Sequence, residues 1–187
     1  RNRNSWVHSD SPAEATEKAK ELVRMSVARA AMLKPLHERQ ISVTRSALVV
    51  GGGVAGMNAA LGIADQGFNV GLVEKETELG GLSRRLTKTI EGMDINAYIS
   101  DLIDKVTHHP KIDVLTQSVI VDFSGFKGNF KTEVLVGQNM ASRKIEHGVV
   151  VMATGANEYQ PTEYLYGVNP RVLTQLELAA RLEKENG

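Results

Sequence analysis

The chain has 187 residues, with 22 basic and 22 acidic side chains and no cysteine. This length suits one domain of ordinary size with an appended segment, and the balanced charge argues against general nucleic-acid binding. Without cysteine the chain alone supplies no disulfide, thiol nucleophile or cysteine-ligated cluster, and no apolar run reaches the roughly 20 residues that a membrane span requires.

The first predicted element is a long helix that starts after Ser11. We expect the Ser11 side chain to cap this helix, with Glu14 completing a capping box and Pro12 in the first turn. Apolar residues then recur at helical spacing up to Pro35, which ends the pattern. This apolar stripe is predicted to be a docking face.

A connector over residues 36–45 separates this helix from the rest of the chain. The sequence therefore predicts an amino-terminal helical segment over residues 1–44 and a second part over residues 45–187. The polar start of the chain, residues 1–10, is unlike a secretory signal, and we expect a cytoplasmic protein.

The second part opens with the pattern of a βαβ unit. Ser46–Val50 is a short apolar run suited to a buried strand, and it leads directly into the glycine-rich residues 51–56. An alanine-rich helix over residues 57–66 and a second buried strand over Asn69–Val73 follow, and Glu74 closes that strand. This order fills about 30 residues, the length of one βαβ unit of a dinucleotide-binding fold.

The remainder of the chain is predicted to contain one more large helix and several short strands. Asp94 is the expected N-cap of the helix, whose buried face would consist of Ile95, Ile99, Leu102 and Val106. Strands are expected over residues 112–115, 118–121, 129–136 and 143–152, and a charged helix over residues 172–185. The apolar end of the last strand, Val149–Met152, is expected to return to the buried parallel sheet. The predicted fold class is α/β, a Rossmann-like domain whose parallel sheet carries an antiparallel hairpin or meander insertion, preceded by a helix.

The glycine turn carries the clearest chemical signal. Gly51 permits a sharp exit from the strand, Gly53 leaves the backbone bare for a pyrophosphate, and Gly56 allows the helix to pack closely on the sheet. The first amides of the helix, at Val54 and Ala55, would point at the phosphates together with the positive end of the helix dipole. The turn therefore predicts dinucleotide binding.

Glu74 stands where a carboxylate accepts hydrogen bonds from both ribose hydroxyls of an adenosine. A 2′-phosphate would meet this carboxylate as a like charge, so the sequence disfavours NADP. The alternative is a solvated glutamate at the strand end. Lys75 is predicted to lie either beside the adenosine or in solvent.

Two later features favour FAD over NAD as the dinucleotide. Residues 78–84 follow Glu74 at close range, and their two glycines are typical of flavoproteins that bring backbone alongside the FAD diphosphate and flavin. A second strand-to-turn step, at Ala153, Thr154 and Gly155, returns the chain to the nucleotide. NAD is the alternative, because the glycine turn alone does not distinguish the two.

These motifs together resemble the FAD half of the two-dinucleotide-domain flavoprotein reductases. Four stretches more closely resemble the A subunit of heterodisulfide reductases: residues 5–9, 14–35, 79–85 and 161–175. The resemblance implies a cytoplasmic iron–sulfur flavoprotein, an FAD-dependent oxidoreductase that passes electrons from a donor such as hydrogenase, formate dehydrogenase or NADH. The electrons go to partner subunits B and C, which reduce a disulfide. The family's flavin is a proposed site of electron bifurcation, with ferredoxin as one acceptor. Whether this chain forms a homodimer is left open.

The resemblance also implies which further residues touch FAD. Ser83 and Arg84 are candidates for contact with the flavin ring or ribityl chain, where an arginine would stabilise anionic reduced flavin; a solvated Arg84–Arg85 pair is the alternative. Val119 is placed where such folds use backbone groups to touch the adenine, and a core valine is the alternative there. Besides the glycine turn, Glu74 and Lys75, the predicted FAD-binding set is Gly81, Leu82, Ser83, Arg84, Val119, Ala153, Thr154 and Gly155.

The chain departs from that family in two respects. The cluster-binding cysteines are absent, including one expected where this sequence has Asn4, and the second nucleotide-binding half is missing. We therefore expect FAD but no metal site and no catalytic side chain here, with iron–sulfur clusters only in full-length members and no competent reductase formed by this chain alone. Two other hypotheses stay open: a non-catalytic, nucleotide-stabilised module that docks other subunits, and a NAD-dependent dehydrogenase domain.

Overall fold

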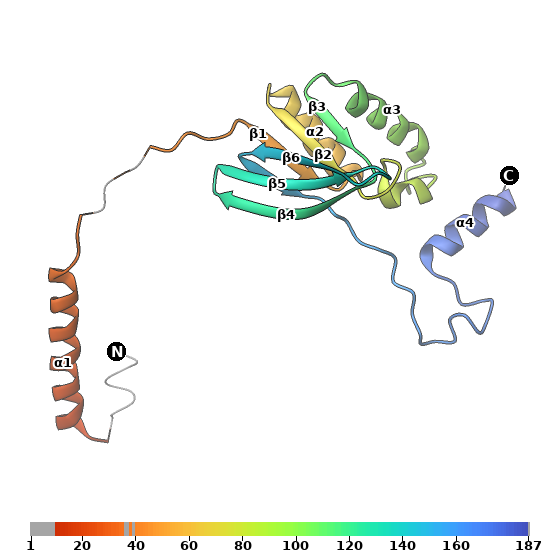
Figure 1. Ribbon diagram of the computed structural model, residues 1–187. Coiled ribbons are helices and arrows are strands. Elements are labelled where there is room, and N and C mark those ends of the chain that lie inside the picture. The colour runs from red at the N-terminus through yellow and green to blue at the C-terminus, as the bar shows by residue number, and fades with distance from the viewer. Residues whose placement is uncertain (1–9, 36–37, 39, 187) are drawn as a thin grey trace. The chain divides into compact units, whose positions relative to one another are not determined.

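The computed structural model describes residues 10–35, 38 and 40–186 (Figure 1). The chain forms two compact units, Arg1–Ile41 and Ser42–Gly187. The stretch 5–9 and Asn4, on which part of the family resemblance rests, lie outside the described residues. Among the described residues, none of the helices is at once long enough and apolar enough to cross a membrane.

The described residues of the first unit contain one helix, α1 (Pro12–Ala31), which differs from its prediction at both ends. The Ser11 side chain makes no capping hydrogen bond; instead the Ser11 carbonyl accepts the first helical hydrogen bond, from the Ala15 amide at 3.0 Å. The helix ends at Ala31, four residues before Pro35, with Met32 as its C-cap. The predicted capping box is therefore wrong, while the long helix itself is confirmed.

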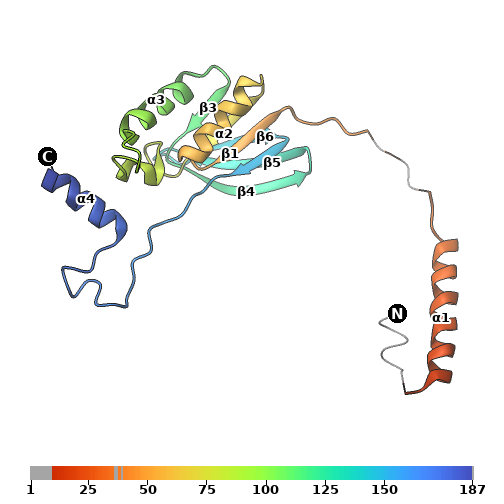
Figure 2. The ribbon, with the colours of Figure 1, turned by 180° about the vertical axis from the view of Figure 1, so that it is seen from behind.

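The second unit is built on a parallel sheet of four strands. The strands are β1 (Ser46–Val50), β2 (Asn69–Val73), β3 (Ile112–Leu115) and β7 (Val149–Met152), and their spatial order is β3-β2-β1-β7. Helices α2 (Val54–Asp65) and α3 (Ile95–His108) cover one face of this sheet (Figures 1 and 2). The three parallel strands and the return of the last strand to their sheet confirm the sequence pattern.

A second, antiparallel sheet lies on the opposite face of the parallel one. It consists of β4 (Ser118–Phe126), β5 (Asn129–Val136) and β6 (Ala141–His147), joined in chain order. Ala47 and Val49 of β1 pack with the helices, whereas Leu48 packs with Val134 of β5. Alternate residues of one strand therefore face two different cores, which explains why the strand is apolar throughout.

The start of α3 agrees with the sequence prediction in detail. One carboxylate oxygen of Asp94 accepts a hydrogen bond from the Ala97 amide at 3.0 Å, so Asp94 is the N-cap. The buried side chains of the helix are Ile99, Leu102 and Val106. Ile95, the fourth predicted member, is only half-buried at the first position of the helix.

Several boundaries and one burial prediction were wrong. The predicted strand over residues 143–152 is two strands, because β6 ends at His147 and the chain passes through Gly148 into β7. The end residues of β7 are not buried, since Val149 is 49% and Met152 is 69% exposed, while Val150 and Val151 are half-buried. Within residues 40–186, β7 pairs only with β1 and forms an edge of the sheet, which leaves these side chains uncovered.

Two short helices complete the second unit. A 3-10 helix, η1 (Gly81–Arg85), forms in the region after β2 where the sequence showed no regular pattern. The last helix, α4 (Gln175–Asn186), starts three residues later than predicted. Thr174 and Glu177 cap it reciprocally: the Thr174 amide donates to Glu177 Oε2 at 2.8 Å, and the Glu177 amide donates to Thr174 Oγ1 at 3.3 Å.

Candidate dinucleotide-binding site

The glycine turn joins the carboxyl end of β1 to the start of α2, and two of its glycines are required by close packing. Gly51 has a φ of +107°, and a Cβ on it would collide with the Ala153 carbonyl. A Cβ on Gly56 would collide with the Gly51 carbonyl. The turn is also tied to the next strand, because the Gly51 amide donates to the Val73 carbonyl at 2.8 Å.

Gly53 is different, because no atom of the described residues occupies the place of its missing Cβ. It is the N-cap of α2 with a φ of −74°, and a Cβ on it would meet no atom within 4 Å. The space that a Cβ would take before the first turn of the helix is therefore open. Open space in front of helix amides is where a diphosphate binds, so this position fits the group that the sequence predicts.

Glu74 lies directly beside this turn and is only 6% exposed. Its Oε2 accepts a hydrogen bond from the Gly52 amide at 2.6 Å, and its Oε1 accepts one from the Glu76 amide at 2.9 Å. The alternative of a solvated glutamate is therefore wrong. An ionised carboxylate has about four acceptor positions, so two remain for ligand hydroxyls.

Sequence reasoning missed Gly52 as a member of this site. A Cβ on Gly52 would clash with the Leu79 side chain and lie 3.0 Å from both the Cβ and Oε2 of Glu74. Only glycine leaves room for the carboxylate at this position. The run of three consecutive glycines, Gly51 to Gly53, is the signal that would have indicated it.

The segment after Glu74 lies against the glycine turn. A Cβ on Gly81 would lie 3.4 Å from the Gly53 Cα, and the Gly80 amide donates to the Gly52 carbonyl at 2.8 Å. Leu82 is 44% exposed at the start of η1. The structure therefore brings the backbone of this segment to the mouth of the turn.

Two side chains of this segment make contacts within the protein. The Ser83 hydroxyl donates to the Gly80 carbonyl. The Arg84 guanidinium donates to the Leu79 carbonyl at 2.8 Å and forms an ion pair with Glu78 at 2.6 Å. The guanidinium thus holds the loop that precedes η1. The Arg84 side chain is also 45% exposed, so the prediction of a solvated arginine stays open beside that of a flavin contact.

The remaining predicted residues lie around the same end of the sheet. The Ala153 amide donates to the Val50 carbonyl at 2.8 Å. The next two residues, Thr154 and Gly155, are exposed. Lys75 is exposed and lies 3.6 Å from Glu76. Val119 is 50% exposed, so its alternative as a core valine is wrong.

A further ion pair joins η1 to the chain beyond Gly155. Arg85 donates to Glu158 Oε2 at 2.9 Å, and the Glu158 side chain is only 15% exposed. The pKa of the Glu158 carboxyl is lowered chiefly by a hydrogen bond from Thr174 and to a lesser degree by the Arg85 guanidinium. This ion pair links the segment between Gly155 and α4 to η1. The Arg85 side chain is itself 52% exposed, so the alternative of a solvated arginine stays open for it.

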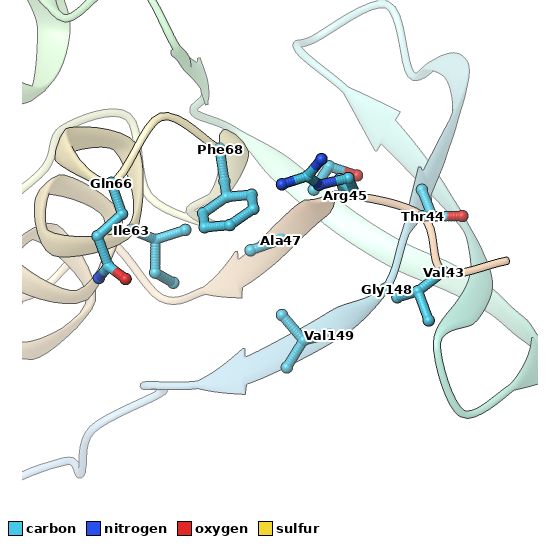
Figure 3. Close-up of a pocket in the computed structure, with 10 residues that line it drawn as sticks. Val43, Thr44, Arg45, Ala47, Ile63, Gln66, Phe68, Gly148 and Val149 are labelled. Carbon is cyan, nitrogen blue, oxygen red and sulfur yellow. The ribbon is translucent and has the colours of Figure 1, made fainter.

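A cavity of about 640 Å³ lies at the opposite end of the parallel strands (Figure 3). It is bordered by Ala47 near the start of β1, Val149 at the start of β7, and Ile63 of α2. The Arg45 guanidinium lies 5.7 Å from the centre of the Phe68 ring beside it. This hollow is separate from the glycine turn, which follows the carboxyl end of β1. In the described part of the chain, no group of three or more histidine, aspartate or glutamate side chains is placed to hold a metal ion.

The fold and the turn define a dinucleotide-binding oxidoreductase domain. Residues 45–186 match the family described as pyridine nucleotide-disulphide oxidoreductase, and the chain belongs to this family. The L-proline dehydrogenase from P. horikoshii shares the fold, with a TM-score of 0.52 and 25% identity over 65% of this chain and 25% of that one. The predicted Rossmann-like FAD-binding fold and the oxidoreductase class are thus confirmed.

More particular relatives belong to heterodisulfide reductases. The second iron–sulfur A subunit of CoB–CoM heterodisulfide reductase in Methanopyrus kandleri is 48% identical over 132 residues, which are 70% of this chain and 20% of that protein. The A subunit of the H2:CoB–CoM heterodisulfide,ferredoxin reductase of Methanothermobacter marburgensis is 44% identical over 136 residues, covering 72% of this chain and 20% of that protein. The predicted resemblance to the heterodisulfide reductase A subunit is confirmed, and the chain spans about a fifth of the length of these relatives.

Proposed function

We propose that residues 45–187 bind FAD and form the flavin-binding part of a heterodisulfide-reductase-type electron-transfer subunit. The observation that carries this proposal is the open space over Gly53 at the start of α2, beside the buried carboxylate of Glu74. A bare turn next to a buried acceptor suits a diphosphate joined to a ribose. The isoalloxazine ring of FAD, when bound, would supply the redox chemistry.

In this proposal each part of the cofactor has its own set of contacts. Backbone of Gly51, Gly53, Val54, Ala55 and Gly56 holds the diphosphate, and the free acceptor positions of Glu74 hold the ribose hydroxyls. The remaining residues are assigned to the adenosine, ribityl or flavin parts: Lys75, Gly81, Leu82, Ser83, Arg84, Val119, Ala153, Thr154 and Gly155. Since Arg84 already pairs with Glu78, it would act on flavin mainly by fixing the loop before η1.

The wider role rests on the family resemblance and is part of the proposal. Electrons would enter from a hydrogenase, a formate dehydrogenase or NADH and leave to disulfide-reducing subunits B and C or to ferredoxin. We propose a cytoplasmic location. The amino-terminal segment over residues 1–44 would dock partner subunits or a second copy, since α1 buries none of its own side chains and exposes Val23 and Val27.

Flavin reconstitution tests the proposal directly. The purified chain, incubated with FAD and desalted, should retain a yellow chromophore that dithionite bleaches. A protein that carries no flavin absorbance after reconstitution would rule the proposal out. Binding of NADH in competition with FAD would favour the NAD-dependent dehydrogenase alternative, whereas FAD binding without any electron transfer in a complete complex would favour the docking module.

A further inference from the structure

The middle residue of the glycine turn is held from both sides. The Gly52 amide donates to Glu74 Oε2 at 2.6 Å, and the Gly52 carbonyl accepts from the Gly80 amide at 2.8 Å. Gly52 is itself buried, and the Leu79 side chain, 5% exposed, closes over it. Water therefore has little access to replace either partner.

The carboxylate is fixed just as firmly as the amide that it binds. The Glu74 backbone amide donates to the Leu115 carbonyl at 2.8 Å, and the Glu74 carbonyl accepts from the Ser118 amide at 2.9 Å. The Glu76 amide holds the second carboxylate oxygen at 2.9 Å. Glu74 thus binds the middle of the glycine turn through its side chain and is held by β3 and β4 through its backbone.

We propose that Glu74 is a positioning residue for the diphosphate turn, in addition to its assigned contact with ribose. Its carboxylate accepts the hydrogen bond of the buried Gly52 amide. This bond keeps the flanking residues, Gly51 and Gly53, in the geometry that leaves the helix amides open. This inference rests on the proposed function. It predicts that loss of the carboxylate weakens diphosphate binding even when the ligand has no ribose hydroxyls.

The physical reason is the high cost of an unpaired buried amide. Removing one partner of a buried hydrogen bond exacts the desolvation penalty of the group left behind. The bond lost here is also a strong one, because its acceptor is a carboxylate. The turn can avoid this penalty only by moving, and no side chain at Gly51, Gly52 or Gly53 restrains that movement. Without the Glu74 carboxylate the diphosphate site would therefore be distorted and would bind more weakly.

A cycle of two ligands and two proteins separates the two roles of Glu74. The ligands are ADP and 2′,3′-dideoxy-ADP, which keeps the diphosphate but cannot bond to the carboxylate through its sugar. The variant is Glu74→Ala, and the control is Glu76→Ala, which removes a nearby exposed carboxylate that forms an ion pair with Lys75 on the surface. We expect Glu74→Ala to bind dideoxy-ADP roughly 10- to 100-fold more weakly than wild type, and Glu76→Ala to bind it equally well.

Amide hydrogen exchange of the nucleotide-free protein gives a second readout. The Gly52 amide should exchange slowly in wild type and in Glu76→Ala and at least about tenfold faster in Glu74→Ala. If Glu74→Ala does not fold, Glu74→Gln supplies the same comparison, because its amide offers one acceptor oxygen in place of two. Its Gly52 exchange should then lie above that of wild type.

Each outcome decides one of the two proposals. Unchanged affinity for dideoxy-ADP in Glu74→Ala, with weakened affinity for ADP, would show that the carboxylate serves the ribose alone and would overturn the inference. Equal Gly52 exchange in all variants would overturn it as well. Failure of the wild-type protein to bind FAD or ADP would instead refute the proposed function, and the exchange rates would still decide whether Glu74 braces the turn.

Discussion

Replacing Gly53 by tryptophan should abolish nucleotide binding while leaving the fold intact. A Cβ at this position meets no protein atom within 4 Å, and the residue has an ordinary φ of −74°. The new Cβ would therefore meet no clash, and we expect the indole beyond it to occupy the space proposed for the diphosphate. Replacing a glycine N-cap should cost no more than about 1 kcal/mol of folding free energy.

The magnitude follows from the hydrogen bonds that the ligand would lose. Hydrogen bonds to charged groups contribute about 1.5–3 kcal/mol each. Loss of two backbone contacts to the diphosphate would thus cost about 3–6 kcal/mol, which weakens FAD binding by roughly 10²- to 10⁴-fold.

Gly62 provides a matched control on the same helix. A Cβ there also meets nothing within 4 Å, and Gly62 is exposed. Gly62→Trp should bind FAD as wild type does, by flavin fluorescence titration, and both variants should unfold at similar urea concentrations. Tight FAD binding by Gly53→Trp would refute the assignment of the site, and an equal loss in both variants would show that bulk on α2, and not access to the turn, is responsible.

Three further predictions concern the scaffold. The pKa of the buried His147 imidazole is lowered by desolvation from its ordinary 6.5. As the pH falls, this imidazole is therefore protonated in the unfolded chain before it is protonated in the folded protein. The contribution of the neutral His147 imidazole to the free energy of unfolding should be complete above about pH 6.5 and should decrease as the pH falls below that value. In urea unfolding, His147→Gln should lessen this decrease. Leu48→Ala should lower the free energy of unfolding, measured in urea, by about 2–5 kcal/mol, because Leu48 is fully buried. Val149→Ala, on the exposed edge strand, should change the free energy of unfolding by no more than about 0.5 kcal/mol. An NMR titration should place the pKa of Glu158 below its usual value, and Thr174→Val should raise it, since the threonine makes the largest contribution.

The buried imidazole behind the pH prediction also has a defined protonation pattern. His147 Nδ1 lies 3.1 Å from the Val149 carbonyl, which can only accept, so Nδ1 carries the proton. Nε2 then accepts from the Thr132 hydroxyl at 2.7 Å. A decline of stability that is identical in His147→Gln would show that another group is responsible.

The apolar strands and the glycine turn could be predicted because their signals are local. A run such as Ser46–Val50 is apolar at almost every position, and that pattern requires a strand covered on both faces. The N-cap at Asp94 was predictable for the same reason, since it depends on a residue three positions away. Ser11 shows the limit of such local rules: its side chain has the right chemistry, yet it makes no capping bond.

Features that depend on distant neighbours were missed or wrong. Val149–Met152 has the composition of a buried strand, but its exposure depends on whether another strand lies beside it, which composition does not report. Gly52 was overlooked because its function is to make room for Glu74, twenty-two positions further along the chain. The contact of Arg85 with Glu158 spans a still longer separation.

By itself the sequence determined that this chain folds as an α/β domain, that a glycine turn opens its first helix after β1 and that an acid closes its second strand. The hydrophobic periodicity and the conformational freedom of glycine act within a few residues, so both can be recognised in a short stretch of sequence. Only the tertiary structure decided that the acid turns inward onto the Gly52 amide and that the space over Gly53 stays open. Both depend on how β1, β2 and η1 converge at one end of the sheet, and packing of segments distant in the chain sets that convergence.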